Sequence, residues 1–197
     1  MRVLVLVFWL LLPLPVIAYH LGPGQHKLAM EQVDSLMTQA EDAVATEDWG
    51  TAVACYDEAL SLLPKHDIAA NRRIRLERAK AQMFVSQLPV AHSELNTLVE
   101  ELRDDPGRDQ ATYRDARATL ANAQYYMTWL MRLEGQSRER WEPEIEAARQ
   151  SLVLLAEEAK ADGLEEIALK HQEDLESAIR LARMSLSDLQ GLPLPSQ

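Results

Sequence analysis

Cysteine and glycine are scarce in this sequence, and their scarcity excludes several kinds of site. A single cysteine among 197 residues allows no internal disulfide, no cysteine-based zinc site and no CxxC redox pair. The seven glycines do not form GxGxxG or GxxxxGK, the spacings of the commonest phosphate-binding loops. No stretch after residue 18 sustains an alternation of apolar and polar residues, so we expect no β-strands.

Basic residues are also few. The chain holds 31 acidic and 20 basic residues, a formal net charge of −11, and has no long basic run. Nucleic-acid binding depends on neutralising phosphates, so we expect no nucleic-acid partner. Apolar residues make up 47% of the chain, which is enough for one domain with a hydrophobic core.

Patterns typical of catalysis are missing as well. Most carboxylates occur as neighbouring pairs, and adjacent helical residues point about 100° apart, which indicates solvated faces and not catalytic dyads. The serines lack a nucleophile elbow, and the histidines form no HExxH motif. We expect His66, His92 and His171 at the surface. The sequence therefore predicts no enzyme activity, no metal or other cofactor, and no small-molecule substrate.

The first residues have the layout of a secretory signal peptide. Arg2 precedes the apolar run Val3–Leu12, two prolines follow, and Ala18 offers a small residue for cleavage. We expect residues 1–18 to be removed and the protein to be exported to the periplasm or outside the cell, in a bacterial envelope. The alternative is a membrane anchor formed by residues 3–18, although a bilayer span needs about 20 apolar residues. No other membrane contact is expected.

A helical period of apolar residues runs through the rest of the chain. Prolines and glycines mark the ends of the predicted helices, and Gly107, Gly135, Gly163 and Gly191 follow helix ends, where a left-handed residue is favoured. The expected helices are 28–46, 48–63, 67–85, 88–103, 109–133, 143–161 and 164–190. Residues 19–27 are then an extended N-terminal segment, residues 28–190 one helical domain, and residues 191–197, GLPLPSQ, an extended tail.

The strongest motif lies in the second predicted helix. Asp48 stands at its start and can cap it by accepting a hydrogen bond from a backbone N–H. The motif continues with Trp49, Ala52, Tyr56, Ala59 and Pro64.

This spacing resembles the second half of a tetratricopeptide repeat. The resemblance implies an all-α solenoid of about three degenerate antiparallel helix pairs, closed by a C-terminal capping helix. In this register Leu36, Ala40 and Ala43 take the corresponding positions of the first helix. The whole layout is similar to exported bacterial proteins of this class. The alternative is another kind of antiparallel helical bundle.

A basic stretch is the first candidate for a binding surface. Arg73, Arg75, Arg78 and Lys80 lie on the predicted helix 67–85. In tetratricopeptide proteins the first helix of each pair lines the groove that receives peptides. Arginine forks match carboxylates, so this groove could receive an acidic peptide. The alternative is that these cations neutralise acidic residues of the adjoining helices.

An aromatic stretch is the second candidate. Tyr125, Tyr126 and Trp129 lie on a helix that is apolar nearly all round, and Trp141 follows in the next turn. Such a helix is expected to be buried between neighbours. The alternative is that part of this aromatic surface contacts a partner, since tyrosine and tryptophan are favoured at interfaces.

These features predict an exported, non-catalytic helical-repeat adaptor or scaffold that binds a protein or peptide. The alternative is a structural component of an envelope assembly, held by its outer faces and not by a peptide groove. The two interpretations differ in which surface carries the contact.

Overall fold

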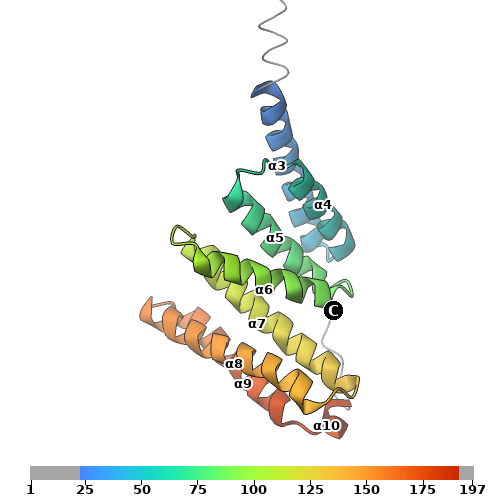
Figure 1. Cartoon of the computed structure of the whole chain (residues 1–197), viewed down its shortest axis with the longest axis vertical. Coiled ribbons are helices and arrows are strands. Elements are labelled where there is room, and N and C mark those ends of the chain that lie inside the picture. Colours follow the sequence, from blue (N-terminus) through green and yellow to red (C-terminus); the bar gives the residue numbers. More distant parts are fainter. Residues whose placement is uncertain (1–22, 191–197) are drawn as a thin grey trace, which may run out of the picture. The chain divides into compact units, whose positions relative to one another are not determined.

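Helices account for all the regular structure in the computed structural model, which describes residues 23–190 (Figure 1). No strand occurs in this range, so the all-α prediction is confirmed. The expected signal segment, residues 1–18, and the expected tail, residues 191–197, lie outside it. The eight described helices are α3 (Pro23–Ala45), α4 (Trp49–Leu62), α5 (Ile68–Gln82), α6 (Leu88–Asp104), α7 (Gln110–Leu133), α8 (Arg138–Ala161), α9 (Glu165–Arg183) and α10 (Leu186–Gln190).

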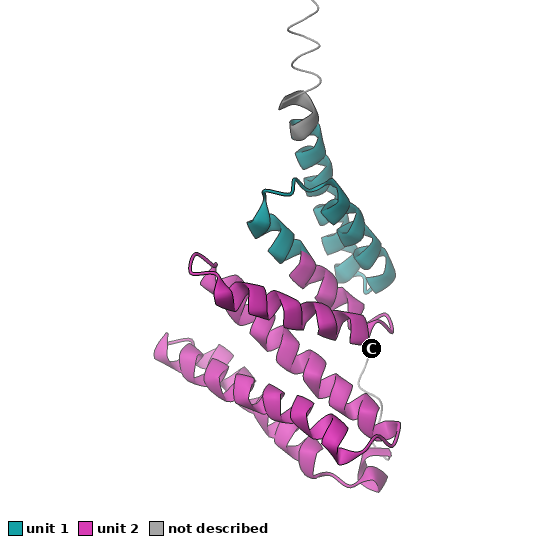
Figure 2. Ribbon diagram, in the orientation of Figure 1, with its two compact units in different colours: residues 1–74 teal, residues 75–197 magenta. Residues whose placement is uncertain are grey.

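The chain divides into two compact units, residues 1–74 and residues 75–197, and the boundary falls inside helix α5 (Figure 2). In the first unit α3 packs against α4. In the second unit α6 packs on α7, α7 on α8 and α8 on α9, while the short α10 lies against α7. From α6 to α9, helices consecutive in the sequence are therefore neighbours in space, as are α3 and α4.

Small residues form the contact between α3 and α4. Ala40 of α3 and Ala52 and Ala59 of α4 are fully buried, and Tyr56 is 2% exposed. The carboxylate of Asp48 accepts a hydrogen bond from the Thr51 N–H at 3.2 Å, so its predicted role as a helix cap is confirmed. Alanine at the buried positions leaves room for the two helices to approach, and the tyrosine fills the space beside them.

Enlarging Ala59 tests this packing. Ala59→Leu should lower the free energy of unfolding by about 1–3 kcal/mol, because a packed core tolerates added volume poorly. Thermal melts provide the measurement. The matched control is Ala161→Leu, at an exposed position near the end of α8, where the change should stay within about 0.5 kcal/mol. Equal effects at both positions would contradict a helix crossing at Ala59.

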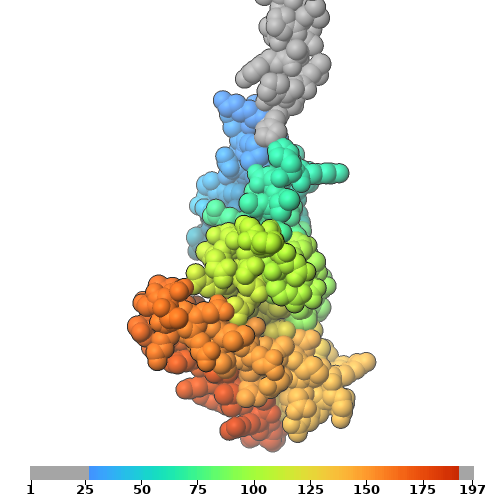
Figure 3. Space-filling model, turned by 60° about the vertical axis from the view of Figure 1, so that its left-hand side comes forward, coloured from blue at the N-terminus to red at the C-terminus, as the bar shows by residue number. Residues whose placement is uncertain are grey.

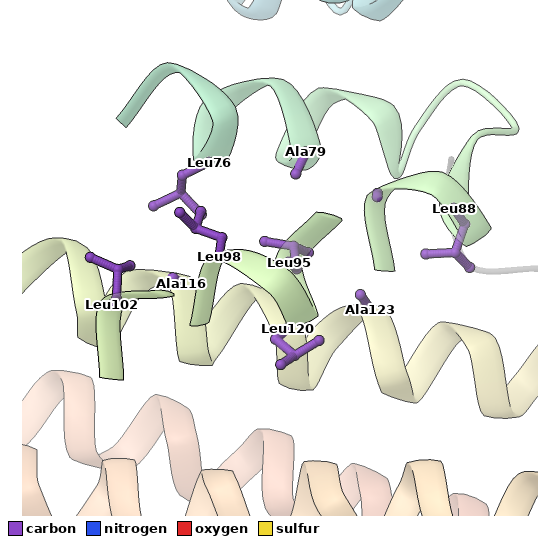
Figure 4. Close-up of a cluster of buried hydrophobic side chains, with 10 residues drawn as sticks. Leu76, Ala79, Leu88, Leu95, Leu98, Leu102, Ala116, Leu120 and Ala123 are labelled. Carbon is purple, nitrogen blue, oxygen red and sulfur yellow. The ribbon is translucent and has the colours of Figure 1, made fainter. Parts of the chain in front are cut away.

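A leucine-rich core joins three helices of the second unit (Figure 4). Leu76 and Ala79 of α5 point toward Leu95 and Leu98 of α6, and α7 contributes to the same cluster. The remaining buried members of this cluster are Leu88, Ala91, Leu102, Ala116, Leu120 and Ala123. The 3.6-residue spacing places these side chains on one face of each helix, which is why the apolar period in the sequence predicts them.

Two predicted helix boundaries in the second unit are wrong. Helix α8 begins at Arg138 and not at 143, because Ser137 ends the preceding turn and its carbonyl accepts the Arg140 N–H at 3.0 Å. Pro143 therefore lies inside the helix, where it removes one backbone hydrogen bond close to the start.

The expected single helix 164–190 is in fact two. Met184 is extended, with ψ 144°, and separates α9 from α10. The Ser185 hydroxyl accepts the Asp188 N–H at 3.2 Å and donates to the Asp188 carboxylate at 2.6 Å, so Ser185 caps the start of α10. At the other end of the chain, α3 begins at Pro23, earlier than the expected residue 28.

Glycine has two different roles in these helices. Gly135 and Gly163 follow α7 and α8 with φ of +71° and +74°, as predicted, whereas Gly107 does not have a positive φ. A Cβ added at Gly163 would meet nothing within 4 Å, so a substitution there is strained only through its backbone. Gly50 lies inside helix α4, where an added Cβ would make ordinary contact with Asp48 at 3.9 Å.

Alanine at these two glycines should therefore shift stability in opposite directions. Gly163→Ala should lower the free energy of unfolding by about 1–2 kcal/mol, the cost of a left-handed alanine. Gly50→Ala should raise it by about 0.5–1 kcal/mol, because alanine is the better helix former. Urea unfolding of both variants is the measurement. Shifts of the same sign would show that the backbone conformations differ from those described.

Candidate functional site

Three of the four cations of the predicted groove, Arg75, Arg78 and Lys80, are engaged by carboxylates of the same chain. Arg75 Nη1 lies 2.7 Å from Glu101 Oε2, and Arg75 Nε also donates to Glu94. Arg78 lies 3.8 Å from the same Glu94. Both acidic partners lie on α6, the helix that packs beside this part of α5. Arg73 is exposed and belongs to the other compact unit.

Lys80, in the second unit, is also paired with carboxylates of the same chain. Its Nζ lies 2.9 Å from Glu77 and 2.7 Å from Asp115 of α7. Burial lowers the pKa of Lys80, but the hydrogen bonds that it donates to Asp115 and Glu77 outweigh that effect and raise the pKa above its ordinary value. Lys80 is therefore held charged by its neighbours. An acidic peptide at this face would have to compete with carboxylates that are already bound.

The predicted aromatic surface is largely core. Trp129 is only 7% exposed and packs with Ile145 and Leu152 of α8. Tyr125, Tyr126 and Trp141 are partly buried against the same cluster. Burial also raises the pKa of the Tyr125 hydroxyl. A partner could reach only the edges of these rings, and Trp129 would have to leave the core to touch it.

A polar network that sequence reasoning missed connects α6 with α8. His92 Nε2 lies 2.9 Å from Glu144 Oε2, and the Asn96 amide donates to the His92 carbonyl at 3.0 Å. An ionised carboxylate only accepts hydrogen bonds, so His92 Nε2 carries the shared hydrogen. The side chain of His92 is only 15% exposed, so its predicted surface position is wrong. His92 and Glu144 are 52 residues apart, and no local pattern could have paired them.

The other two histidines differ from each other. His66 is exposed, as predicted. His171 of α9 is partly buried with its Nδ1 out of contact with water, so the surface prediction is wrong for it. This burial lowers the pKa of His171. Burial penalises the charged imidazolium, and the neutral ring is the form that suits this position.

The Glu144 carboxylate should make stability depend on pH. The hydrogen bond from His92 is the largest cause of its pKa lying below the ordinary 4.5. A carboxylate with a depressed folded pKa contributes stability above its unfolded pKa and loses it as pH falls through the folded pKa. Glu144→Gln should therefore be less stable than the wild type at pH 7, and the difference should shrink as pH falls below about 4.5.

Urea unfolding at a series of pH values measures this effect. The exposed Glu157, changed to glutamine, provides the matched control. A Glu144→Gln deficit that stays constant from neutral to strongly acidic pH would contradict the assignment.

The α8–α9 hairpin carries several exposed apolar side chains, the second feature that sequence reasoning missed. Five large aliphatic side chains on either side of its turn are 39–56% exposed: Val153, Leu154, Leu164, Ile167 and Leu169. The signal in the sequence was the run Leu152–Leu155, which is too long to fit on one buried face of a helix. Figure 3 shows α8 in orange and α9 in red, side by side at the surface.

Several carboxylates lie on the same hairpin. Glu158 is bound to Arg117 at 2.8 Å, and Asp162 is paired with Arg114. Glu157, Glu165 and Glu166 are exposed and close to the apolar residues in the sequence. The tip of the hairpin therefore combines apolar side chains with acidic ones that face solvent.

Comparisons of this chain with protein-family models, with curated proteins and with solved structures found no match. Among the residues that the structure describes, no three histidine, cysteine or acidic side chains come together as a metal site. None of the described helices combines the length and the apolar character that crossing a bilayer requires.

Proposed function

We propose that this protein is an exported, non-catalytic binding module that holds another protein through its α8–α9 hairpin. The observation that carries the proposal is the exposure of five large aliphatic side chains on the two helices of that hairpin. Single exposed apolar residues are ordinary on protein surfaces, but several in one short segment favour an interaction site. Covering them stabilises a complex by about 25 cal/mol for each Å² of apolar surface removed from water.

The partner that fits this surface has an apolar face bordered by lysine or arginine. Glu157, Glu165 and Glu166 face solvent beside the apolar side chains and would attract such a border. An amphipathic basic helix of another protein has this chemistry. The acidic residues would guide the approach, and the aliphatic side chains would supply most of the affinity.

The cationic face of α5 is the weaker candidate for the contact. Arg75 is bonded to Glu94 and Glu101 and Arg78 is paired with Glu94, so the alternative that these arginines neutralise a neighbouring helix accounts for them. This pairing favours contact through an outer surface over capture of an acidic peptide in a groove. It also favours the second candidate function, a structural component of an envelope assembly held by its outer faces.

Two further parts of the proposal concern architecture and location. We take the helix pairs to follow a tetratricopeptide-like register, supported by the burial of Ala40, Ala52, Tyr56 and Ala59 at the predicted positions. Export rests on the signal-like segment 1–18, which lies outside the described residues. Mass spectrometry of the native protein should find a chain that begins at Tyr19. An intact Met1 in the soluble cytoplasm would contradict export, and an intact Met1 in membranes would favour the anchor.

Crosslinking in native envelopes tests the binding surface. The full chain and the variant Leu154→Ser with Leu169→Ser are compared with a control, Leu28→Ser with Ile68→Ser, at similarly exposed leucine and isoleucine positions elsewhere. The partner should be lost from the hairpin variant and retained by the control. A partner that all three proteins retain would contradict the hairpin as the contact surface. A complex of constant composition that does not exchange with added free protein would favour the structural component over the adaptor.

A further inference from the structure

A small apolar groove lies at the C-terminal half of α7. Its volume is about 190 Å³, and Pro89 of α6 with Met127, Leu130 and Met131 of α7 supply its apolar lining. Leu130 is 38% exposed, and Val90, next to Pro89, is 56% exposed. The groove therefore presents apolar surface to water at a site separate from the α8–α9 hairpin tip. Methionine side chains are flexible, so they can adapt to whatever covers them.

The described chain ends beside α7, the helix that supplies most of the apolar lining of this groove. Helix α10 packs against α7, and its Leu189, 1% exposed, shares a core cluster with Trp129, the residue before Leu130. Figure 1 shows α10 beside the end of α7. Residues 191–197 follow directly from Gln190. An extended segment gains about 3 Å per residue, so these residues span about 20 Å, well over the diameter of a helix.

The sequence of this segment suits an apolar groove. Leu192 and Leu194 each precede a proline, and residues before proline favour an extended backbone. No side chain in residues 191–197 is charged. Proline also lowers the entropy lost when the segment becomes ordered. Since the segment is tethered to α10, its effective concentration at the groove is in the millimolar range or above, and weak contacts suffice.

We propose that residues 191–197 fold back along α7 and place Leu192 and Leu194 in the groove formed by Pro89, Met127, Leu130 and Met131. The occupant is thus a segment of the same chain and not a second copy or another protein. Its leucines cover the exposed part of Leu130 and shield the two methionine sulfurs. The proposal concerns a different surface from the proposed partner site, and either one can fail without the other.

Methionine oxidation provides the test. The full chain, a chain ending at Gln190 and the variant Leu192→Ser with Leu194→Ser are treated with dilute hydrogen peroxide, and sulfoxide is measured by mass spectrometry. Met127 and Met131 should oxidise about fivefold faster in both altered proteins, since thioether oxidation follows exposure. Met37, partly buried in the other compact unit, is the internal control and should keep its rate. Thermal melts of the three proteins show whether a rate change reflects local uncovering or general unfolding.

The outcomes separate the possible occupants. A free peptide GLPLPSQ added to the shortened chain should restore protection of Met127 and Met131. Unchanged oxidation rates in both altered proteins would overturn the proposal. Protection in the full chain that depends on protein concentration would assign the groove to a second copy and would overturn it as well.

Discussion

Replacing Leu98 with alanine should destabilise the protein by about 2–5 kcal/mol, the range for a buried leucine truncated to alanine. Leu98 is fully buried on α6, and Figure 4 shows it facing Leu76 of α5. Alanine keeps the helix propensity of α6 intact. The loss therefore comes from the missing contacts and from the cavity that remains. With a total stability of about 5–15 kcal/mol for a domain, this one substitution could unfold the second unit.

Urea unfolding followed by circular dichroism measures the loss. Leu154→Ala is the matched control, because Leu154 is 51% exposed on α8 and fills no cavity when present. Its effect should stay within about 0.5 kcal/mol. If Leu98→Ala were as mild as Leu154→Ala, the cluster between α5, α6 and α7 would not be the core of this unit.

Replacing Arg132 with alanine should lower the free energy of unfolding by about 3 kcal/mol. This loss is typical when a buried charged donor is removed from its acceptors. Arg132 of α7 is 8% exposed and donates to the carbonyls of Leu181 and Met184 at the end of α9. Its guanidinium also lies 4.8 Å above the centre of the Trp141 ring. Burial lowers the pKa of Arg132, but arginine stays charged at any physiological pH. The guanidinium of Arg132 thus supplies hydrogen bonds to two backbone carbonyls at the end of α9, where the chain turns into α10.

Arg132→Lys should recover less than half of the loss, since an ammonium cannot reproduce the planar fork that reaches two carbonyls. The exposed Arg103, changed to alanine, is the control. Hydrogen exchange gives a local readout, because the amides of residues 184–190 should lose protection before those of α6. Unchanged exchange in α10 would contradict the role of Arg132 as its anchor.

The helices and their buried faces could be predicted from the sequence alone. The stripe Leu88, Ala91, Leu95, Leu98 and Leu102 is buried as its spacing indicates. Gly135 and Gly163 end helices in the left-handed conformation, and Asp48 caps α4. These features depend on residues within a few positions of one another, so local periodicity and backbone sterics are sufficient to specify them. For the same reason the missed break at Met184 was visible in principle, in the capping pattern of Ser185 and Asp188.

The candidate sites were decided by tertiary structure. Arg75 is bound by Glu94 and Glu101. The basic residues around it in the sequence had instead predicted a cationic surface open to a partner. Trp129 entered the core, and Leu154 and Leu169 remained outside it. The sequence by itself determined that the chain forms amphipathic helices and where most of them begin and end. Only the packing decided which charges meet and which apolar residues stay exposed, because Coulombic and van der Waals contacts depend on distance in space and not on separation along the chain.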